Sequence, residues 1–215
     1  MSTAISPRIT RTHFIFTLLT VSAFLMFIYL AITTVESYRG DVQGEISLVR
    51  DSMTAAEWNA VDDRTKRRYS EWVIQSGLYE TIKDWFLPKP SGSEVVKSFS
   101  GKWNYQLVVN LQVFLFQVIY RLTMLEFWLW TLLPLVVAIL VSGINAHRAK
   151  RYQLTGTRAN IVRIYLKAVW LSVIGLVCYL VLPSMMGAFA PYAPAIAFLL
   201  FATAAAGIVS AFHKG

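Results

Sequence analysis

The sequence is poor in the residue that makes covalent cross-links, because it holds a single cysteine, Cys178. One cysteine cannot form an intramolecular disulfide, so packing and hydrogen bonds must hold the fold. Cys178 lies inside an apolar run, where a thiol usually behaves as a small hydrophobic side chain. It therefore gives no indication of the redox compartment.

The sequence also lacks the motifs of the common enzyme classes. It contains no G-x-S-x-G turn, no H-E-x-x-H, no C-x-x-C and no Walker-type phosphate loop. Its 3 histidines, His13, His147 and His213, do not have the close spacing of a metal-ligand pair. We therefore expect that the protein is not an enzyme and that it binds no metal ion or other cofactor.

Long apolar runs are what the sequence has in abundance, since 56% of its residues are hydrophobic. The runs cover about 14–35, 122–145, 168–186 and 193–212, and each approaches the ~20 residues that a membrane-spanning helix needs. An ordinary soluble domain is less apolar. The sequence thus predicts an all-α, polytopic membrane protein with about four transmembrane helices, forming one membrane domain over residues 1–215.

The first apolar run raises the question of a cleaved signal peptide. It is longer than the apolar region of a typical signal peptide, and Ala31-Ile32-Thr33 is a poor cleavage site. These features favour an uncleaved signal-anchor, and a cleaved signal peptide is the alternative.

Residues 36–102 form the main polar segment, and over 36–105 ten Lys and Arg residues nearly balance eleven Asp and Glu residues. Thr54 and Glu57 have the spacing of a capping box, which predicts a helix start. Gly77 predicts a break in that helical region, and the prolines, glycines and serines of 89–101 predict a loop. We expect a helical extracytoplasmic segment.

Residues 103–121 predict an amphipathic helix that leads into the second span. Polar side chains recur there with helical spacing and share one face; they are Gln106, Asn110, Gln117 and Arg121. Such a helix would lie on the outer membrane surface or against a partner helix. Its expected interfacial anchors are the aromatic residues Trp103, Tyr105, Trp128 and Trp130. Glu126 is expected at the outer interface, either hydrated or paired with a neighbour.

Basic residues gather between the second and third spans, in a predicted loop over 146–167 that contains no Asp or Glu. Its cations are Arg148, Lys150, Arg151, Arg158, Arg163 and Lys167. Because basic flanks stay in the cytoplasm, we expect this loop and both termini to be cytoplasmic and residues 36–121 to be periplasmic. The loop would contact anionic lipid headgroups. The balanced charge elsewhere argues against direct nucleic-acid binding.

The third and fourth runs predict an antiparallel hairpin, because the sequence GAFAPYAP between them is short. Small residues recur at every fourth position in the fourth run: Ala202, Thr203, Ala206, Gly207, Ser210 and Ala211. Small residues let helices approach closely in lipid. They predict a helix-packing face, and the alternative is that the alanines simply fill the helix.

The chain begins with an N-terminal anchor, which is followed by a polar segment rich in Trp and Arg. The second span then ends in VSGINAHRAKRYQLTGTR, and the later part of the chain contains LPSMMGAFAPYAP and SAFHKG. This layout resembles a family of inner-membrane proteins, of unknown function, encoded by integrating conjugative elements and conjugative plasmids. The basic loop departs from the family's more usual form, which contains an acidic residue. The resemblance implies a non-enzymatic accessory or assembly component of a conjugative type IV secretion system. Its partners would be other membrane proteins of that system or a coupling ATPase.

Two other functions are compatible with the sequence. An entry-exclusion protein would act in the recipient cell. A small transporter or channel would need polar groups along its spans, and few are present apart from Glu126. The oligomeric state is left open.

Overall fold

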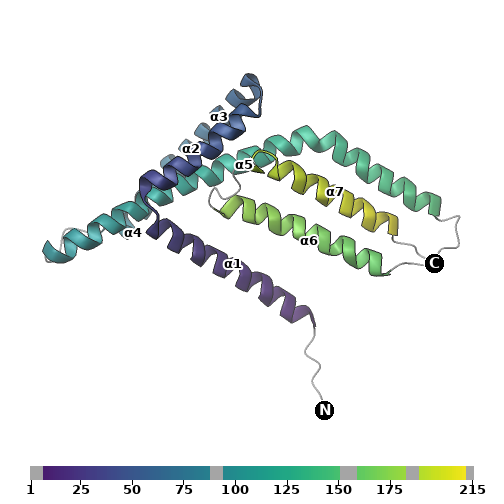
Figure 1. The fold of residues 1–215 in the computed structure, drawn as a ribbon, viewed down its shortest axis with the longest axis horizontal. Coiled ribbons are helices and arrows are strands. Elements are labelled where there is room, and N and C mark those ends of the chain that lie inside the picture. The colour runs from purple at the N-terminus through teal and green to yellow at the C-terminus, as the bar shows by residue number, and fades with distance from the viewer. Residues whose placement is uncertain (1–6, 88–93, 151–158, 183–188, 212–215) are drawn as a thin grey trace, which may run out of the picture.

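A computed structural model describes residues 7–87, 94–150, 159–182 and 189–211, and the described chain is helical, without β-strands. Its elements are α1 (Pro7–Ile32), α2 (Val35–Asp51), α3 (Ala55–Tyr69), the π-helix η1 (Ser70–Gln75), α4 (Leu78–Phe86), α5 (Glu94–Lys150), α6 (Ala159–Val181) and α7 (Ala193–Ala211) (Figure 1). The prediction of an all-helical protein is confirmed.

The chain reverses sharply after α1. The chain bends by 117° between the part of α1 from Thr20 to Ile32 and the whole of α2. The new helix starts at Thr34, whose side chain accepts a hydrogen bond from the Ser37 backbone N–H, 3.4 Å away. This is the usual way in which a threonine satisfies one of the free N–H groups of a first helical turn.

The capping box predicted for α3 is present. The Glu57 carboxylate accepts a hydrogen bond of 3.0 Å from the Thr54 backbone N–H, and the Thr54 side chain accepts one from the Glu57 N–H. These contacts with Thr54 lower the pKa of Glu57. The break predicted at Gly77 is also present, because Gly77 has a φ of 75° and separates η1 from α4. Glycine adopts this left-handed conformation without steric cost.

The longest element is α5, a single helix of 57 residues, which corresponds to a length of roughly 86 Å. It corrects the predicted loop over 89–101, because the helix already begins at Glu94 and includes Gly101. One glycine costs a helix only about 1 kcal/mol, so it need not end one. Pro134 lies inside the helix, where proline removes a backbone hydrogen bond and favours a kink. Figure 1 shows α5 changing direction along its length.

The predicted basic loop over 146–167 is also corrected, since most of it is helical. Its first residues belong to the end of α5, and α6 begins at Ala159, nine positions before the third apolar run. Lysine and arginine are good helix formers, so a hydropathy run marks the apolar part of a helix and not its ends. Only residues 151–158 lie between the two helices, and they are outside the described residues.

Three helices are long and apolar enough to cross a membrane: Trp103–Ala149, Asn160–Val181 and Ala193–Ala211. A fourth span results if the bent pair of α1 and α2 is counted as one. The structure therefore has three to four candidate spans, and the protein is suited to a membrane.

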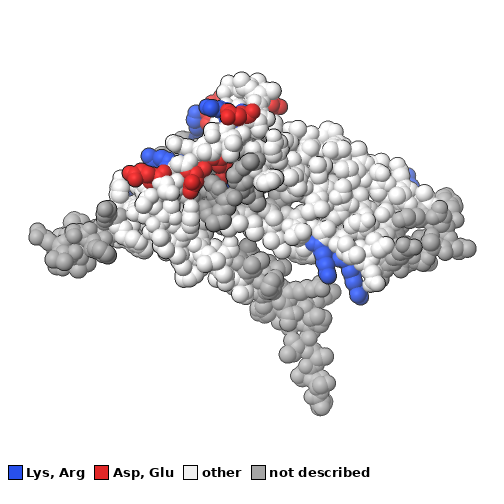
Figure 2. Space-filling model, viewed as in Figure 1, with Lys and Arg blue, Asp and Glu red and all other residues white. Residues whose placement is uncertain are grey.

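The helices form two bodies that α5 connects (Figure 1). The platform consists of α2, α3, η1, α4 and the first half of α5. The bundle consists of the second half of α5 with α6 and α7. The end of α5, the start of α6 and the end of α7 lie together at one end of the molecule, whereas α1 runs apart from the bundle (Figure 1). Figure 2 shows red and blue atoms mixed over the platform, whereas the bundle is mostly white.

Candidate functional site

The most unusual feature of the described chain is a buried polar cluster where the platform meets the bundle. We call it the joint, and its members are Tyr38, Glu45, Gln117, Arg121 and Tyr179. Each of these residues has at most 4% of its surface exposed. Because ionised groups are rarely buried without partners, the contacts of Arg121 and Glu45 decide what the joint does.

Arg121 is the centre of the joint. Its Nε donates to Oε1 of Glu45 at 2.8 Å, and its Nη2 donates to Oε2 at 2.6 Å. The pair is thus bidentate, which is the strongest geometry available to these two side chains. Only 2% and 3% of the Arg121 and Glu45 side chains are exposed.

The same guanidinium also closes the end of α6. Its Nη1 donates to the backbone carbonyls of Tyr179 and Leu182, which belong to the last turn of the helix and the residue after it. The last carbonyls of a helix have no partners within it and carry partial negative charge, so a cation is stabilised there. The guanidinium also lies 5.1 Å from the centre of the Tyr179 ring. Arg121 therefore connects α2, α5 and α6.

Two further side chains complete the joint. The Tyr38 hydroxyl donates to Oε1 of Gln117 at 2.6 Å, and the Gln117 amide donates to Oε2 of Glu45 at 3.4 Å. These bonds join α2 to α5 at a second level, one helical turn from Arg121. The amide of Gln117 thus gives the buried carboxylate a third hydrogen-bond donor, beside the two of Arg121.

The polar face of α5 continues to the end of α1. The Asn110 amide donates to the backbone carbonyls of Leu30 and Thr33, at 2.8 and 2.7 Å. The Gln106 amide donates to the Thr33 carbonyl at 2.6 Å. The predicted amphipathic face therefore exists, but it packs against other helices of the same chain. Of the two environments predicted for it, packing against partner helices is the one observed, and those helices are α1, α2 and α6 of the same chain. Nothing in the local sequence of 103–121 indicates that α1, α2 and α6 would return to this face.

Glu126 has partners on the platform. Its carboxylate lies 3.0 Å from Arg64 Nη1 and 2.5 Å from Arg68 Nη2. The side chain of Glu126 is 30% exposed, and the Arg68 guanidinium also lies 5.7 Å from the centre of the Trp72 ring. Glu126 is thus both partly hydrated and paired, but its partners come from α3 and not from neighbours along α5.

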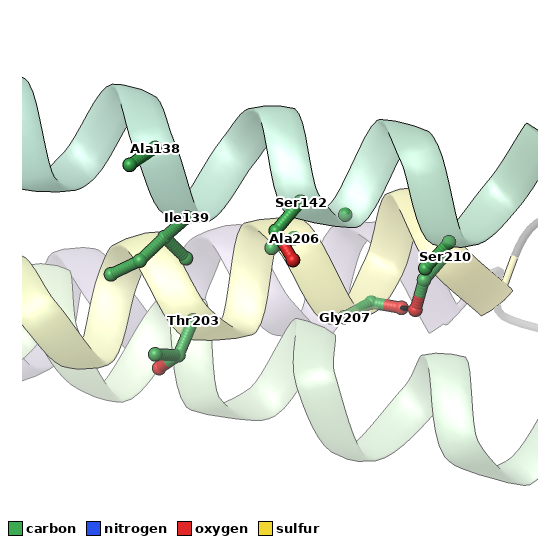
Figure 3. A pocket seen from close by; sticks show the side chains of 9 residues that line it. Ala138, Ile139, Ser142, Thr203, Ala206, Gly207 and Ser210 are labelled. Atoms are coloured by element: carbon green, nitrogen blue, oxygen red, sulfur yellow. Dashed lines mark hydrogen bonds between the residues drawn. The ribbon is translucent and has the colours of Figure 1, made fainter.

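The small residues of α7 lie at two close helix contacts. A Cβ atom added to Gly143 of α5 would lie 2.8 Å from the Ala206 backbone, and one added to Gly207 would lie 2.6 Å from the Tyr165 ring. Beside the first contact is an open groove of about 480 Å³ between α5 and α7. Figure 3 shows Ile139 and Ser142 of α5 directed toward α7 across this groove.

The remaining small residues of α7 differ in burial. Ala202 is fully buried, whereas Thr203 is exposed and bonds the Leu199 carbonyl of its own helix. Ser210 and Ala211 are partly buried near the end of the helix. The face is therefore divided between an inner contact and the groove.

The predicted interfacial aromatic residues also differ in how far their side chains are exposed. Trp103, Tyr105 and Trp130 are 47%, 62% and 64% exposed. Trp128 is half-buried and packs against the cluster that contains Val49. Its indole is thus held by the platform.

Three of the predicted cations have described side chains, and all three are exposed: Arg148, Arg163 and Lys167. The side chains of Lys150, Arg151 and Arg158 lie outside the described residues. No group of three or more potential His, Cys, Asp or Glu metal ligands occurs in the part of the chain that the structure describes.

Sequence reasoning missed Tyr38, Glu45 and Tyr179 as members of the joint. Glu45 stands among several acidic residues of a polar helix, and Tyr179 is one aromatic in an apolar run. The available signal was Arg121, a cation within a mostly apolar helix, because such a residue requires a partner. That signal does not identify which carboxylate supplies it.

Comparison with known proteins gives one result. A family model described as "IncC plasmid conjugative DNA transfer protein DtrJ-like" matches residues 42–213. No curated protein and no solved structure matches the chain. The matched region includes both members of the buried ion pair, most of the platform and the whole described bundle.

Proposed function

Because the chain belongs to the DtrJ-like family of IncC plasmid conjugative DNA transfer proteins, we propose that it is a non-enzymatic membrane component of a conjugative type IV secretion system. It acts in accessory or assembly steps through contacts with other proteins. The observation that carries this proposal is the family match, which spans platform and bundle together and not a single motif.

The proposed location is the bacterial inner membrane, with both termini in the cytoplasm and the platform in the periplasm. Two features support this orientation. The exposed cations Arg148, Arg163 and Lys167 lie in the helix ends that α5 and α6 present beside the C-terminal end of α7 (Figure 1). Cationic flanks favour the cytoplasmic side. The platform, with its mixed charges, lies away from that end (Figure 2).

The platform is the proposed surface for other secretion-system proteins. Trp72 of η1 is 50% exposed, and Trp85 of α4 is 80% exposed. Tryptophan is enriched among the residues that contribute most to protein interfaces. A groove of about 380 Å³ opens between α2, α3 and α5, with Arg39 and Gln112 among the residues that line it. At the opposite end, the exposed cations would face a coupling ATPase.

The proposal is tested by a clean deletion with separate complementation of donor and recipient cells. Complementation of the donor should restore DNA transfer, since a transfer component acts where the secretion system is assembled. A deletion that transfers normally would remove the proposal. A reduction of transfer caused by the protein in recipients alone would instead indicate an exclusion protein.

A photo-crosslinking residue placed at Trp85 tests the contact surface. It should capture a membrane protein of the secretion system in mating cells. The matched control is the same residue at Trp130, which is also exposed but lies in the candidate span. Equal capture of the same protein at both positions would contradict a platform-specific contact.

A further inference from the structure

Two cations lie on one exposed face of α6. Arg163 and Lys167 are four positions apart and are both exposed, so their side chains are neighbours on the helix surface. Trp170 follows three residues later on the same face and is 53% exposed. Figure 2 shows blue side chains projecting from the bundle at the edge where α6 lies.

These cations have no acidic residue near them in the bundle. Every Asp and Glu of the chain lies between Glu36 and Glu126. All ion pairs of the described residues accordingly join residues of the platform and of α5 up to Glu126. Arg163 and Lys167 therefore have no acidic side chain of the bundle beyond Glu126 to pair with and are open to an anion from outside the chain.

The surroundings of the two cations identify the kind of anion. Both lie within the candidate span Asn160–Val181. The flanking side chains Ile164 and Leu171 are each 63% exposed. Long basic side chains in such a position direct their charged ends to the headgroup layer while their aliphatic parts remain in the apolar region. Tryptophan also favours this layer.

We propose that Arg163, Lys167 and Trp170 form a binding site for the headgroup of an anionic phospholipid. The two cations contact the phosphate from adjacent helical turns, and the indole lies against the glycerol region. Ile164 and Leu171 contact the acyl chains. Nucleic acid fits this site poorly, because a polyanion in water would have to approach exposed apolar side chains inside a span.

The test uses the full-length protein in detergent micelles and measures bound lipid by native mass spectrometry. Phosphatidylglycerol is compared with phosphatidylcholine of the same acyl chains. We expect phosphatidylglycerol to bind the wild type at least tenfold more tightly, and Arg163→Gln/Lys167→Gln to lose most of that preference. The charge-exchanged variant Arg163→Lys/Lys167→Arg should retain it. The matched control, Arg39→Gln/Lys83→Gln, removes the same charge from the platform and should also retain it.

Several results would overturn the site. They are equal binding of both lipids by the wild type, an equal loss in the platform control, and displacement of the lipid by millimolar inorganic phosphate. The same conclusion would follow if the double glutamine variant kept its lipid preference but lost binding to an oligonucleotide. If that variant fails to fold, as judged by its circular dichroism, the wild-type comparison and Trp170→Ala decide the question. Trp170→Ala keeps both charges and should weaken phosphatidylglycerol binding severalfold.

Discussion

At the scale of single residues, Arg121 is the position at which a substitution should cost most. Arg121→Met leaves the Glu45 carboxylate buried without its cation and leaves the Tyr179 carbonyl without its donor. Removing one partner of a buried ion pair typically costs 3–5 kcal/mol. We expect a loss of that order in the free energy of unfolding, measured by denaturant titration in detergent.

The double variant Arg121→Met/Glu45→Leu tests how much of this loss comes from the unpaired Glu45 carboxylate. It removes both charges, so part of the lost stability should return, as is common when a whole buried pair is replaced by apolar residues. A double variant no more stable than Arg121→Met would show that the carbonyl contacts of α6, and not the ion pair, dominate the joint.

Glu126→Gln provides a contrast at the same scale. Its partner Arg64 is 49% exposed and Glu126 itself 30% exposed, and pairs open to solvent contribute roughly 0–1 kcal/mol. The substitution should therefore lower stability far less than Arg121→Met, and its small effect should shrink further at high salt. A loss comparable to that of Arg121→Met would mean that the cluster with Arg68 is better shielded than its exposure indicates.

Residue-scale prediction from sequence succeeded where a rule is local. The capping box at Thr54 depends on neighbours three positions apart, and the break at Gly77 depends on one residue's conformational freedom. The partner of Arg121 lies 76 positions away along the chain. No periodicity or local motif carries that information, because it depends on how separate helices pack.

At the scale of helices, the contacts of α5 with α7 and of α7 with α6 depend on two glycines. Gly143→Ala would place a Cβ 2.8 Å from the backbone of Ala206, so the two helices must separate. We expect a loss of about 1–3 kcal/mol from overpacking and a lower thermal midpoint in detergent. Gly207→Leu should be at least as damaging, because a Cβ alone would already lie 2.6 Å from the Tyr165 ring.

Gly175 of α6 supplies the matched control for these two substitutions. A Cβ at this position has nothing within 4 Å. Gly175→Ala should therefore be neutral or raise stability by about 0.5–1 kcal/mol, since alanine favours the helix. If Gly143→Ala proved as harmless as Gly175→Ala, the close approach of α5 and α7 would not be required for stability.

The existence of the helices could be predicted more reliably than their ends. Apolar runs identified the parts of α5, α6 and α7 that suit a bilayer, because hydropathy depends on composition alone. The polar helix of 103–121 and the second span were recognised as adjoining, and they are one continuous element. The basic ends of α5 and α6 were assigned to a loop because charge interrupts a hydropathy run without interrupting backbone hydrogen bonds.

At the scale of the whole molecule, the positions of the helix ends bear on how the chain crosses the membrane, and several of these ends gather at one end of the bundle. The end of α5, the start of α6 and the end of α7 lie together there, and α1 runs apart from the bundle with its N-terminal end directed toward the same side (Figure 1). Such an arrangement is required if α1, α5, α6 and α7 each cross the membrane once in alternating directions. The three-dimensional layout thus agrees with alternating crossings but does not distinguish the two sides of the membrane. The assignment of the shared side to the cytoplasm rests on the distribution of cations.

Topology reporters fused after residues 90 and 155 test this orientation directly. The positive-inside rule predicts a periplasmic signal at 90 and a cytoplasmic signal at 155. Replacing Arg148, Lys150, Arg151 and Arg158 by Gln should weaken the cytoplasmic signal at 155, because short basic flanks carry most of the orienting information. Adding acidic residues to the same segment should change the signal little, since Asp and Glu contribute weakly to topology. A periplasmic signal at 155 in the unmodified protein would invert the assignment and place the platform on the cytoplasmic side. The expected partner of the platform would then be a coupling ATPase and not a periplasmic channel protein.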